Sequence, residues 1–452
     1  MERDEAVVFE NWKNGASLET LSKSYPLEVT EIKKMRSEGL FSCHKPLGLA
    51  FGIDWDGICE NALHKRGSTV LEITQRCNLR CRYCTFGGGF EDHRVHSSLT
   101  MNRDLIERSI LCAIKHGEWL NEISIGFYGG EPLLAFDLLK HATNFALLNS
   151  HDKKLRFNIT TNGTLIDAAK AEFLKNANFS VTISLDGPKF MHDRFRVYEN
   201  GKGSYDDTIS GLRTLLDAYG PELLHKVGIN MVVPTQAWLP FLNDIWDDEP
   251  WIPRSIRANA AIVDPPSGFE LPSPPSKDAD RDLKYEWFSR IKSREPEITT
   301  VEKNTFDFSL AKIHQRCIFP CKRDTFFPNG CCIPGVRKIY VQADGKYHIC
   351  ERVHGTPSIG SVDAGIDLFK LKKIIDEYAI LSFDDCKSCP IISICGICFK
   401  NAYENERFSI EKKRKACISM RRFRQELLRE YGYISQEYPY KLEEWDKVEI
   451  MR

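Results

Sequence analysis

The sequence contains no long apolar run, and this absence bounds where the protein can reside. No stretch approaches the roughly 18 uninterrupted apolar residues that a membrane-spanning helix needs. The opening residues, 1–5, are largely charged and do not form the apolar segment of a signal peptide. These two absences predict a cytoplasmic protein that does not enter the membrane.

An excess of charge of either sign is also lacking. The 62 Lys and Arg residues are balanced by 63 Asp and Glu residues, a formal net charge of −1, which argues against a strongly basic nucleic-acid-binding protein. The 452 residues exceed one ordinary domain, so two or three domains are expected. Cysteine, by contrast, is plentiful: sixteen cysteines in a cytoplasmic chain point to bound metal and not to disulfides.

The first cysteine cluster directly follows an apolar segment, residues 69–74, that predicts a short strand. Cys77, Cys81 and Cys84 have C-x3-C-x2-C spacing. Three thiolates in a tight loop can hold three irons of a [4Fe–4S] cluster and leave the fourth iron open for a cofactor. Zinc is the alternative, but a structural zinc site uses four ligands, and no fourth Cys or His follows at matching spacing.

The segment Cys-Asn-Leu-Arg-Cys-Arg-Tyr-Cys, with Tyr83 before the third cysteine, resembles the signature of radical S-adenosylmethionine (SAM) enzymes. The resemblance implies that one electron passes from the cluster into SAM. Methionine is then released, together with a 5′-deoxyadenosyl radical that abstracts a hydrogen atom. The cofactors carry this chemistry and the protein positions them.

Strands and helices alternate from residue 69 onward. This alternation implies an α/β fold with a parallel sheet and right-handed crossovers, a partly open (β/α)6 barrel whose functional groups gather at the carboxyl ends of the strands. The expected strands are 69–74, 123–128, 156–161, 181–185, 227–233 and 256–263, and the expected helices are 102–116, 136–148, 165–176 and 205–219.

Polar and glycine residues follow the predicted strands at the positions where a SAM site would form. The second strand ends in Gly129, Gly130 and Glu131; two glycines let a ligand approach the backbone, and a carboxylate can bind an ammonium group. A tight turn is the alternative explanation. By resemblance, Glu131 takes the methionine amino group, Ser184 the ribose and Arg196 the methionine carboxylate, where a surface salt bridge is the alternative. The full expected SAM-binding set is Tyr83, Gly129, Gly130, Glu131, Asn162, Ser184, Asp186 and Arg196.

A second cysteine array lies near the end of the chain and resembles the SPASM domain, an extension that carries two auxiliary [4Fe–4S] clusters. The resemblance assigns Cys386, Cys389, Cys395 and Cys417 to the distal cluster and Cys332, Cys350 and Cys398 to the proximal one. The final pair, Cys395 and Cys398, has x2 spacing where the family usually has x3. The fourth proximal ligand stays open between Cys317, Cys321, Cys331 and none of them. A zinc ribbon is the alternative, although it would leave several of these cysteines unused.

Three regions are expected. Residues 1–65 form a small helix-turn-helix-like module that binds a leader peptide, contacts DNA or simply packs; helices are predicted at 18–24, after the capping Ser17, and at 27–38. Residues 66–310 form the radical SAM core with a Pro- and Ser-rich linker. Residues 311–452 form the auxiliary-cluster domain and a C-terminal helix.

Together these motifs most resemble maturases of cysteine-rich ribosomal peptides, which join a cysteine sulfur to a carbon of the precursor as a thioether. That resemblance implies a precursor peptide as substrate, and a flavodoxin or ferredoxin as electron donor. It also implies no nucleic acid or membrane partner. The enzyme alternatives are carbon–carbon crosslinking and formation of formylglycine on a sulfatase. A metal-stabilised DNA-binding regulator is the alternative from another class, although a regulator needs no SAM pocket.

Overall fold

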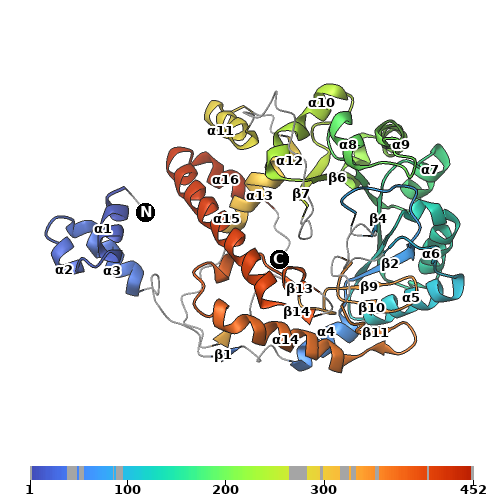
Figure 1. Ribbon diagram of the computed structural model, residues 1–452, viewed down its shortest axis with the longest axis horizontal. Coiled ribbons are helices and arrows are strands. Elements are labelled where there is room, and N and C mark those ends of the chain that lie inside the picture. The colour runs from blue at the N-terminus through green and yellow to red at the C-terminus, as the bar shows by residue number, and fades with distance from the viewer. Residues whose placement is uncertain are drawn as a thin grey trace.

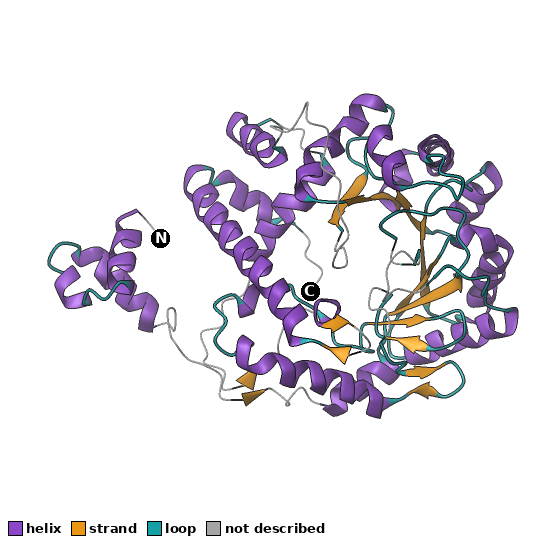
Figure 2. Cartoon of the chain, in the orientation of Figure 1, coloured by secondary structure: helices purple, strands orange, loops and turns teal. Residues whose placement is uncertain are grey.

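The computed structural model describes most of the chain, and Figures 1 and 2 show its arrangement: a curved sheet, helices along its outer side, and a separate group of helices at the N-terminus. The described residues are 3–37, 48–49, 55–84, 86–87, 95–263, 282–295, 299–315, 325–326, 332–351, 356–404 and 407–448. The predicted linker at residues 265–276 lies outside these ranges.

The six predicted strands form a continuous parallel sheet in their order along the chain, as the partial-barrel prediction requires. Helical crossovers place each new strand beside the previous one. The strands are β2 (Ser68–Thr74), β3 (Glu122–Gly129), β4 (Lys154–Thr161), β5 (Ser180–Ser184), β6 (Val227–Val233) and β7 (Arg257–Ile262).

The sheet has eight strands, two more than predicted, because a hairpin from the C-terminal region joins it. Strand β9 (Lys338–Val341) pairs parallel to β2, and β10 (Tyr347–His348) pairs antiparallel to β9. This hairpin was not predicted, because its strands are only four and two residues long. Strands this short do not show the alternating apolar pattern by which a strand is predicted.

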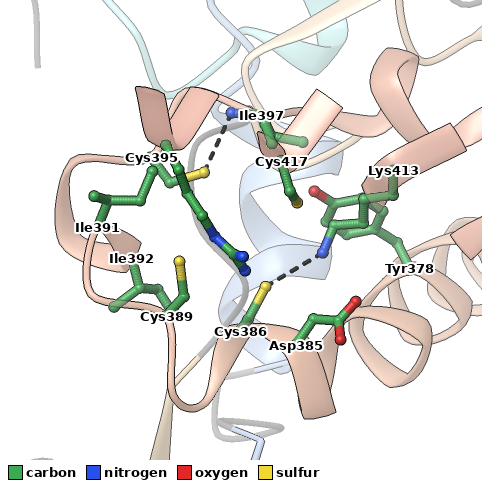
Figure 3. Close-up of a pocket in the computed structure, with 11 residues that line it drawn as sticks. Tyr378, Asp385, Cys386, Cys389, Ile391, Ile392, Cys395, Ile397, Lys413 and Cys417 are labelled. Carbon is green, nitrogen blue, oxygen red and sulfur yellow. Dashed lines mark hydrogen bonds between the residues drawn. The ribbon is translucent and has the colours of Figure 1, made fainter. Parts of the chain in front are cut away.

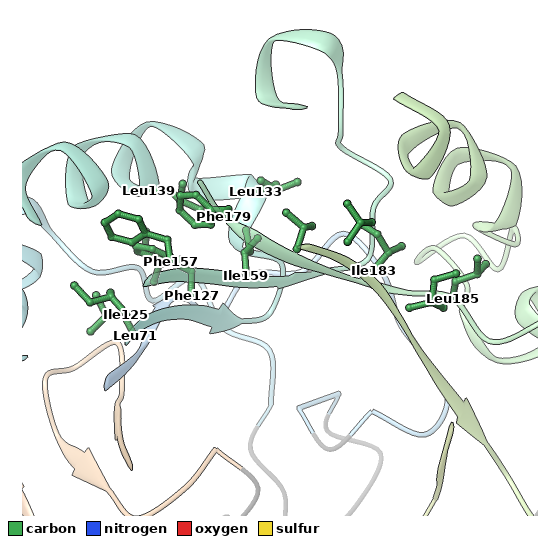
Figure 4. Packing of buried hydrophobic residues seen from close by; sticks show 14 of the residues in the cluster. Leu71, Ile125, Phe127, Leu133, Leu139, Phe157, Ile159, Phe179, Ile183 and Leu185 are labelled. Atoms are coloured by element: carbon green, nitrogen blue, oxygen red, sulfur yellow. The ribbon is translucent and has the colours of Figure 1, made fainter. Parts of the chain in front are cut away.

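The predicted crossover helices cover the outer face of the sheet (Figure 2). They are α5 (Arg103–His116), α6 (Phe136–Asn149), α7 (Ala168–Asn176) and α9 (Tyr205–Tyr219). Helix α7 begins three residues later than predicted because Asp167 caps it, accepting a hydrogen bond from the Lys170 amide. Between helices and sheet, Phe127, Phe157 and Phe179 pack against one another as the centre of the main core (Figure 4).

The N-terminal residues fold around a small core of their own, made by Val8, Val29 and Ile32. The predicted helices appear as α2 (Leu18–Leu21) and α3 (Pro26–Ser37), and α1 (Arg3–Lys13) precedes them. Figure 1 shows this group apart from the sheet. Helix α4 (Trp55–His64) differs, because its Ile58 and Ala62 belong to the main core.

A second helical cluster joins residues before and after the cysteine-rich region. Its core includes Trp287, Leu310, Leu427 and Trp445. Asp307 accepts hydrogen bonds from both indoles and pairs with the buried Lys441 at 3.0 Å. Loss of one partner from such a buried pair costs about 3–5 kcal/mol, so this contact fixes the helices to one another. The helices of this cluster are α11 (Leu283–Ser293), α13 (Phe308–His314), α15 (Ile410–Glu437) and α16 (Tyr440–Asp446), whereas Val301 of α12 (Thr300–Glu302) belongs to the main core.

The cysteine-rich region adds one long helix, and several short strand pairs complete the described elements. Helix α14 (Leu368–Cys386) ends at the first cysteine of the distal set. The short paired strands are β1 (Gly48–Leu49), β8 (Thr325–Phe326), β11 (Gly360–Ser361), β12 (Gly365–Ile366), β13 (Tyr403–Glu404) and β14 (Arg407–Phe408). No helix within the described ranges is long and apolar enough to cross a membrane.

Candidate functional site

The loop with the first three cysteines follows β2 at the carboxyl edge of the sheet. The amide of Leu79 donates to Cys77 Sγ, and that of Phe86 donates to Cys84 Sγ, both at 3.4 Å. Burial raises the pKa of Cys77 to about 12, and it also raises the pKa values of Cys81 and Cys84, with neighbouring thiols adding to the shift at Cys77 and Cys81. A group of positive ions would relieve the repulsion between neighbouring thiolates, and backbone amides already donate hydrogen bonds to two of the sulfurs. The loop therefore fits an iron–sulfur cluster.

Gly129 and Gly130 are required by a close approach of the chain to itself. A Cβ on Gly130 would lie 2.1 Å from the carbonyl oxygen of Arg76, and one on Gly129 would lie 2.2 Å from that of Thr74. Gly129 also has φ +141°. The amides of Gly130 and Glu131 donate to these same two carbonyls, at 2.9 and 2.8 Å. This turn thus holds the residues that lead into Cys77.

Glu131 is buried and joins the ends of neighbouring strands. Its Oε1 accepts hydrogen bonds from the Thr161 hydroxyl at 2.7 Å and the Leu133 amide at 3.0 Å, and Oε2 accepts one from the Asn162 amide at 2.7 Å. Burial raises the pKa of this carboxyl, while the three donors oppose the shift. A carboxylate has about four acceptor positions, so three internal bonds leave room for one donor from a ligand.

Asn162 connects the end of β4 to the cysteine loop. Its side-chain amide donates to Asn78 Oδ1 at 2.9 Å, and Asn78 in turn donates to the Thr164 hydroxyl at 2.9 Å. Asn78 lies between the first two cysteines, and the sequence analysis gave it no role. The hydrogen bond between Asn78 and Asn162 fixes the cysteine loop at the carboxyl end of β4. The polar residues were expected to gather at this edge of the sheet.

Buried Asp186 and Arg196 form a group with the partly buried Tyr83, the residue before the third cysteine. Asp186 accepts hydrogen bonds from the Tyr83 hydroxyl, from Arg196 Nε at 2.8 Å and from the Val232 amide at 2.8 Å. Burial raises the pKa of Tyr83, so the phenol keeps its proton and donates. Arg196 also lies over the Tyr83 ring, 5.4 Å from its centroid. The ion pair between Arg196 and Asp186 is buried, so the alternative of a surface salt bridge is wrong. Ser184 ends β5 and is half-buried.

His192 is a member of this group that sequence reasoning missed. It is fully buried, its Nδ1 accepts a hydrogen bond from the Asp186 amide at 3.2 Å, and its Nε2 lies 3.0 Å from Ser204 Oγ. Burial lowers the pKa of the imidazole far below its usual value, which keeps it neutral. A single histidine within a short helix, α8 (Lys189–Phe195), carries no periodic signal, so only the fold assigns it a partner.

Glu72 ties the C-terminal hairpin to the strand that leads into Cys77. This buried carboxylate accepts hydrogen bonds from the Tyr340 hydroxyl at 2.7 Å and the Ala343 amide at 3.0 Å, both in or next to β9. Cys332 and Cys350 flank the same hairpin in the sequence. The second cysteine region is therefore attached to the sheet directly beside the first.

Cys386, Cys389, Cys395 and Cys417 line one pocket, with apolar walls from Ile391, Ile392 and Ile397 (Figure 3). The Ile397 amide donates to Cys395 Sγ at 3.5 Å. In the part of the chain that the structure describes, no three His, Cys, Asp or Glu side chains are grouped so as to hold a metal ion. The four thiols instead surround a space, which suits a cluster of several ions better than one zinc ion.

The proposed proximal ligands are more dispersed. Cys332 is exposed, Cys350 Sγ lies 3.4 Å from Glu351, and Cys398 caps the 3-10 helix η7 (Phe399–Ala402). These three do not form such a metal-binding group among the described residues. The possible fourth ligands Cys317, Cys321 and Cys331 lie outside the described residues.

Comparisons with known proteins agree with the observed fold of the sheet and with the cysteine loop at its edge. Residues 71–238 match the family model of the Radical SAM superfamily. The chain is 34% identical over 148 residues to the cysteine-type anaerobic sulfatase-maturating enzyme of Clostridium novyi, covering 32% of this chain and 39% of that protein. It is 28% identical over 187 residues to the radical SAM cyclopropyl synthase TigE of Paramaledivibacter caminithermalis, covering 39% and 37%. These matches span well under half the length of either relative.

A solved structure, native anSMEcpe with bound AdoMet, shares the fold with a TM-score of 0.60 at 20% identity, over 84% of this chain and all of that one. The family match covers β2 to β6 and includes the cysteine loop and the Gly-Gly-Glu turn. Residues 71–238, which include the cysteine loop and the Gly-Gly-Glu turn, therefore form a domain that matches the Radical SAM superfamily.

Proposed function

We propose that this enzyme is a maturase that modifies a ribosomally made peptide by joining a cysteine sulfur to carbon in a thioether. The observation that carries the proposal is the second thiol-lined pocket, made by Cys386, Cys389, Cys395 and Cys417 outside the SAM domain. Cleavage of SAM alone needs only the first three cysteines. A second set of four thiols supports an oxidative modification, in which an electron must leave the substrate.

Cys77, Cys81 and Cys84 would hold the first cluster, and SAM would lie against the turn at Gly129–Glu131 and the ends of β4 and β5. Bound there, the cluster and SAM supply a carbon radical that removes a hydrogen atom, and the auxiliary clusters supply an acceptor for an electron. Glu131 keeps one acceptor position for an ammonium group. Arg196 uses Nε for Asp186, and its two terminal nitrogens carry further donors that suit a carboxylate.

The thioether reaction replaces one S–H and one C–H bond with one S–C bond. The peptide carbon would give up one hydrogen atom to the radical that SAM supplies when bound, the thiol would lose a proton to solvent, and one electron would have to leave the peptide. The product therefore lacks two hydrogen atoms and one thiol but keeps its sulfur. A flavodoxin or ferredoxin is the proposed electron donor, and neither nucleic acid nor membrane takes part.

Formation of formylglycine is the second candidate, favoured by the 34% identity to a protein named as an anaerobic sulfatase-maturating enzyme. Mass spectrometry of a peptide encoded beside this protein and co-expressed with it separates the candidates. A thioether loses two hydrogens and an alkylatable cysteine. Formylglycine from cysteine loses the sulfur, and a carbon–carbon crosslink loses two hydrogens while every cysteine still reacts with iodoacetamide. Either of the last two results would overturn the thioether proposal.

Residues 1–37 are proposed to bind the leader of the precursor, because they form a separate helical unit with its own core. Deleting them should reduce processing of the full precursor about tenfold at low peptide concentration, a loss of about 1.4 kcal/mol in binding. SAM cleavage by dithionite-reduced enzyme should not change, since α4 and the main core remain. A leaderless peptide is the control and should be processed equally by both proteins. Equal processing of the full precursor at low concentration would refute leader binding.

A further inference from the structure

Lys413 is a lysine buried in the wall of the pocket formed by the four distal cysteines. Only 2% of its surface is exposed, although lysine is almost never fully buried without a partner. Its Nζ donates a hydrogen bond to Cys386 Sγ at 3.2 Å (Figure 3), and it lies 5.4 Å from the centroid of the Tyr378 ring. The ammonium group therefore faces a thiol and an aromatic ring.

A second cation comes from the same helix. Arg421 lines the pocket, and its hydrogen bond to Cys389 raises the pKa of its guanidinium. Cys417 lies four residues from each cation, so α15 presents all three side chains to the pocket on one face. Burial raises the pKa of the Cys386 thiol, and Lys413 opposes this shift.

Other charges at the pocket do not cancel these two. Asp385 also lines it, but Arg414 binds this carboxylate with both Nε, at 2.7 Å, and Nη2, at 3.2 Å. The remaining walls are Tyr378 and three isoleucines. In such apolar surroundings a cation at hydrogen-bond distance from sulfur is screened far less than one in water.

We propose that Lys413 and Arg421 are positioning residues that raise the reduction potential of the cluster held by Cys386, Cys389, Cys395 and Cys417. The inference rests on the proposed assignment of these four cysteines to an iron–sulfur cluster. A cluster gains one negative charge when it accepts an electron, and fixed cations stabilise the reduced form more than the oxidised form. Net charge and hydrogen bonds to sulfur are the terms that set such potentials. The two cations make the distal cluster an electron acceptor.

The test is a redox titration of the reconstituted full chain, followed by electron paramagnetic resonance without SAM or peptide. Changing Cys77, Cys81 and Cys84 to Ala in every sample removes the signal of the first cluster. Lys413→Met keeps the length of the side chain and removes its charge. At a fixed potential, we expect the ratio of reduced to oxidised distal cluster to fall about tenfold, which is 59 mV for one electron. Lys413→Arg should preserve the ratio.

Lys415→Met is the matched control, because it removes the same charge from an exposed position of α15. It should leave the ratio almost unchanged. An unchanged ratio in Lys413→Met with full iron content would overturn the proposal, and so would zinc in place of iron in the parent protein. If Lys413→Met loses about four irons, the cluster is absent and the ratio is measured in Arg421→Met instead. If Lys413→Met does not fold, the ratio of reduced to oxidised distal cluster in Arg421→Met tests the proposal instead. Failure of the maturase proposal would appear only in the peptide masses and leaves this titration unaffected.

Discussion

Replacing Cys77, Cys81 and Cys84 together with alanine is expected to abolish SAM cleavage and to remove about four of about twelve irons from the anaerobically reconstituted protein. The three thiols are half-buried in one loop, whose amides already donate to two of the sulfurs. Iron and sulfide analysis gives the first quantity, and chromatography of 5′-deoxyadenosine from dithionite-reduced enzyme gives the second.

Cys112→Ala is the control for the loss of a thiol as such. Cys112 lies in α5, belongs to neither cysteine set, and donates from its Sγ to the carbonyl of Val362 at 3.7 Å. This variant should keep its iron and its SAM cleavage. Tightly bound zinc with only about four irons in the parent protein would contradict the assignment of three clusters.

Replacing Gly130 with alanine is expected to reduce SAM cleavage by on the order of 100-fold, because a misplacement near 1 Å at a reacting centre has about that effect. The new Cβ would meet the Arg76 carbonyl oxygen at 2.1 Å and that carbonyl's carbon at 2.5 Å. Both are backbone atoms of the residue before Cys77, so the collision cannot be relieved by rotating a side chain. The cysteine loop must shift or lose its hydrogen bonds to the turn.

Gly67→Ala provides the matched control, since it makes the same change immediately before β2. Its Cβ would meet only Leu120 Cδ1 at 3.6 Å, an ordinary contact. Iron content, SAM binding and the rate of 5′-deoxyadenosine formation should all match the parent protein. If Gly130→Ala cleaves SAM at the parent rate, the turn does not position the loop.

Several features of the site could be predicted from sequence because each is local. Cys77, Cys81 and Cys84 lie close together in one loop, and Gly129, Gly130 and Glu131 are consecutive. The apolar run before each motif predicted the strand that carries it. Parallel pairing then required the motifs to meet at one edge of the sheet. The roles assigned to individual SAM-binding residues and cluster ligands stay predictions.

The contacts that were missed join residues of different elements of the fold. His192 needed Asp186 and Ser204, Asn78 needed Asn162, and the two strands at 338–348 needed β2, more than 260 residues earlier, before any of them had a partner. Short strands and single polar side chains produce no hydrophobic periodicity in the sequence. Their positions were decided by burial, since a buried polar group must find a hydrogen-bond partner wherever the fold supplies one.

The sequence by itself determined the alternation of strands and helices, the thiol spacing and the turn that follows the second strand, since these depend on local periodicity and on glycine. Only the tertiary structure decided that Glu72 ties the C-terminal hairpin to the strand before Cys77, and that Lys413 faces Cys386. A charged side chain in a sequence is most often a solvated one. Its burial against a thiol or a distant hairpin depends on the packing of whole elements, because only packing removes the water that would otherwise bind it.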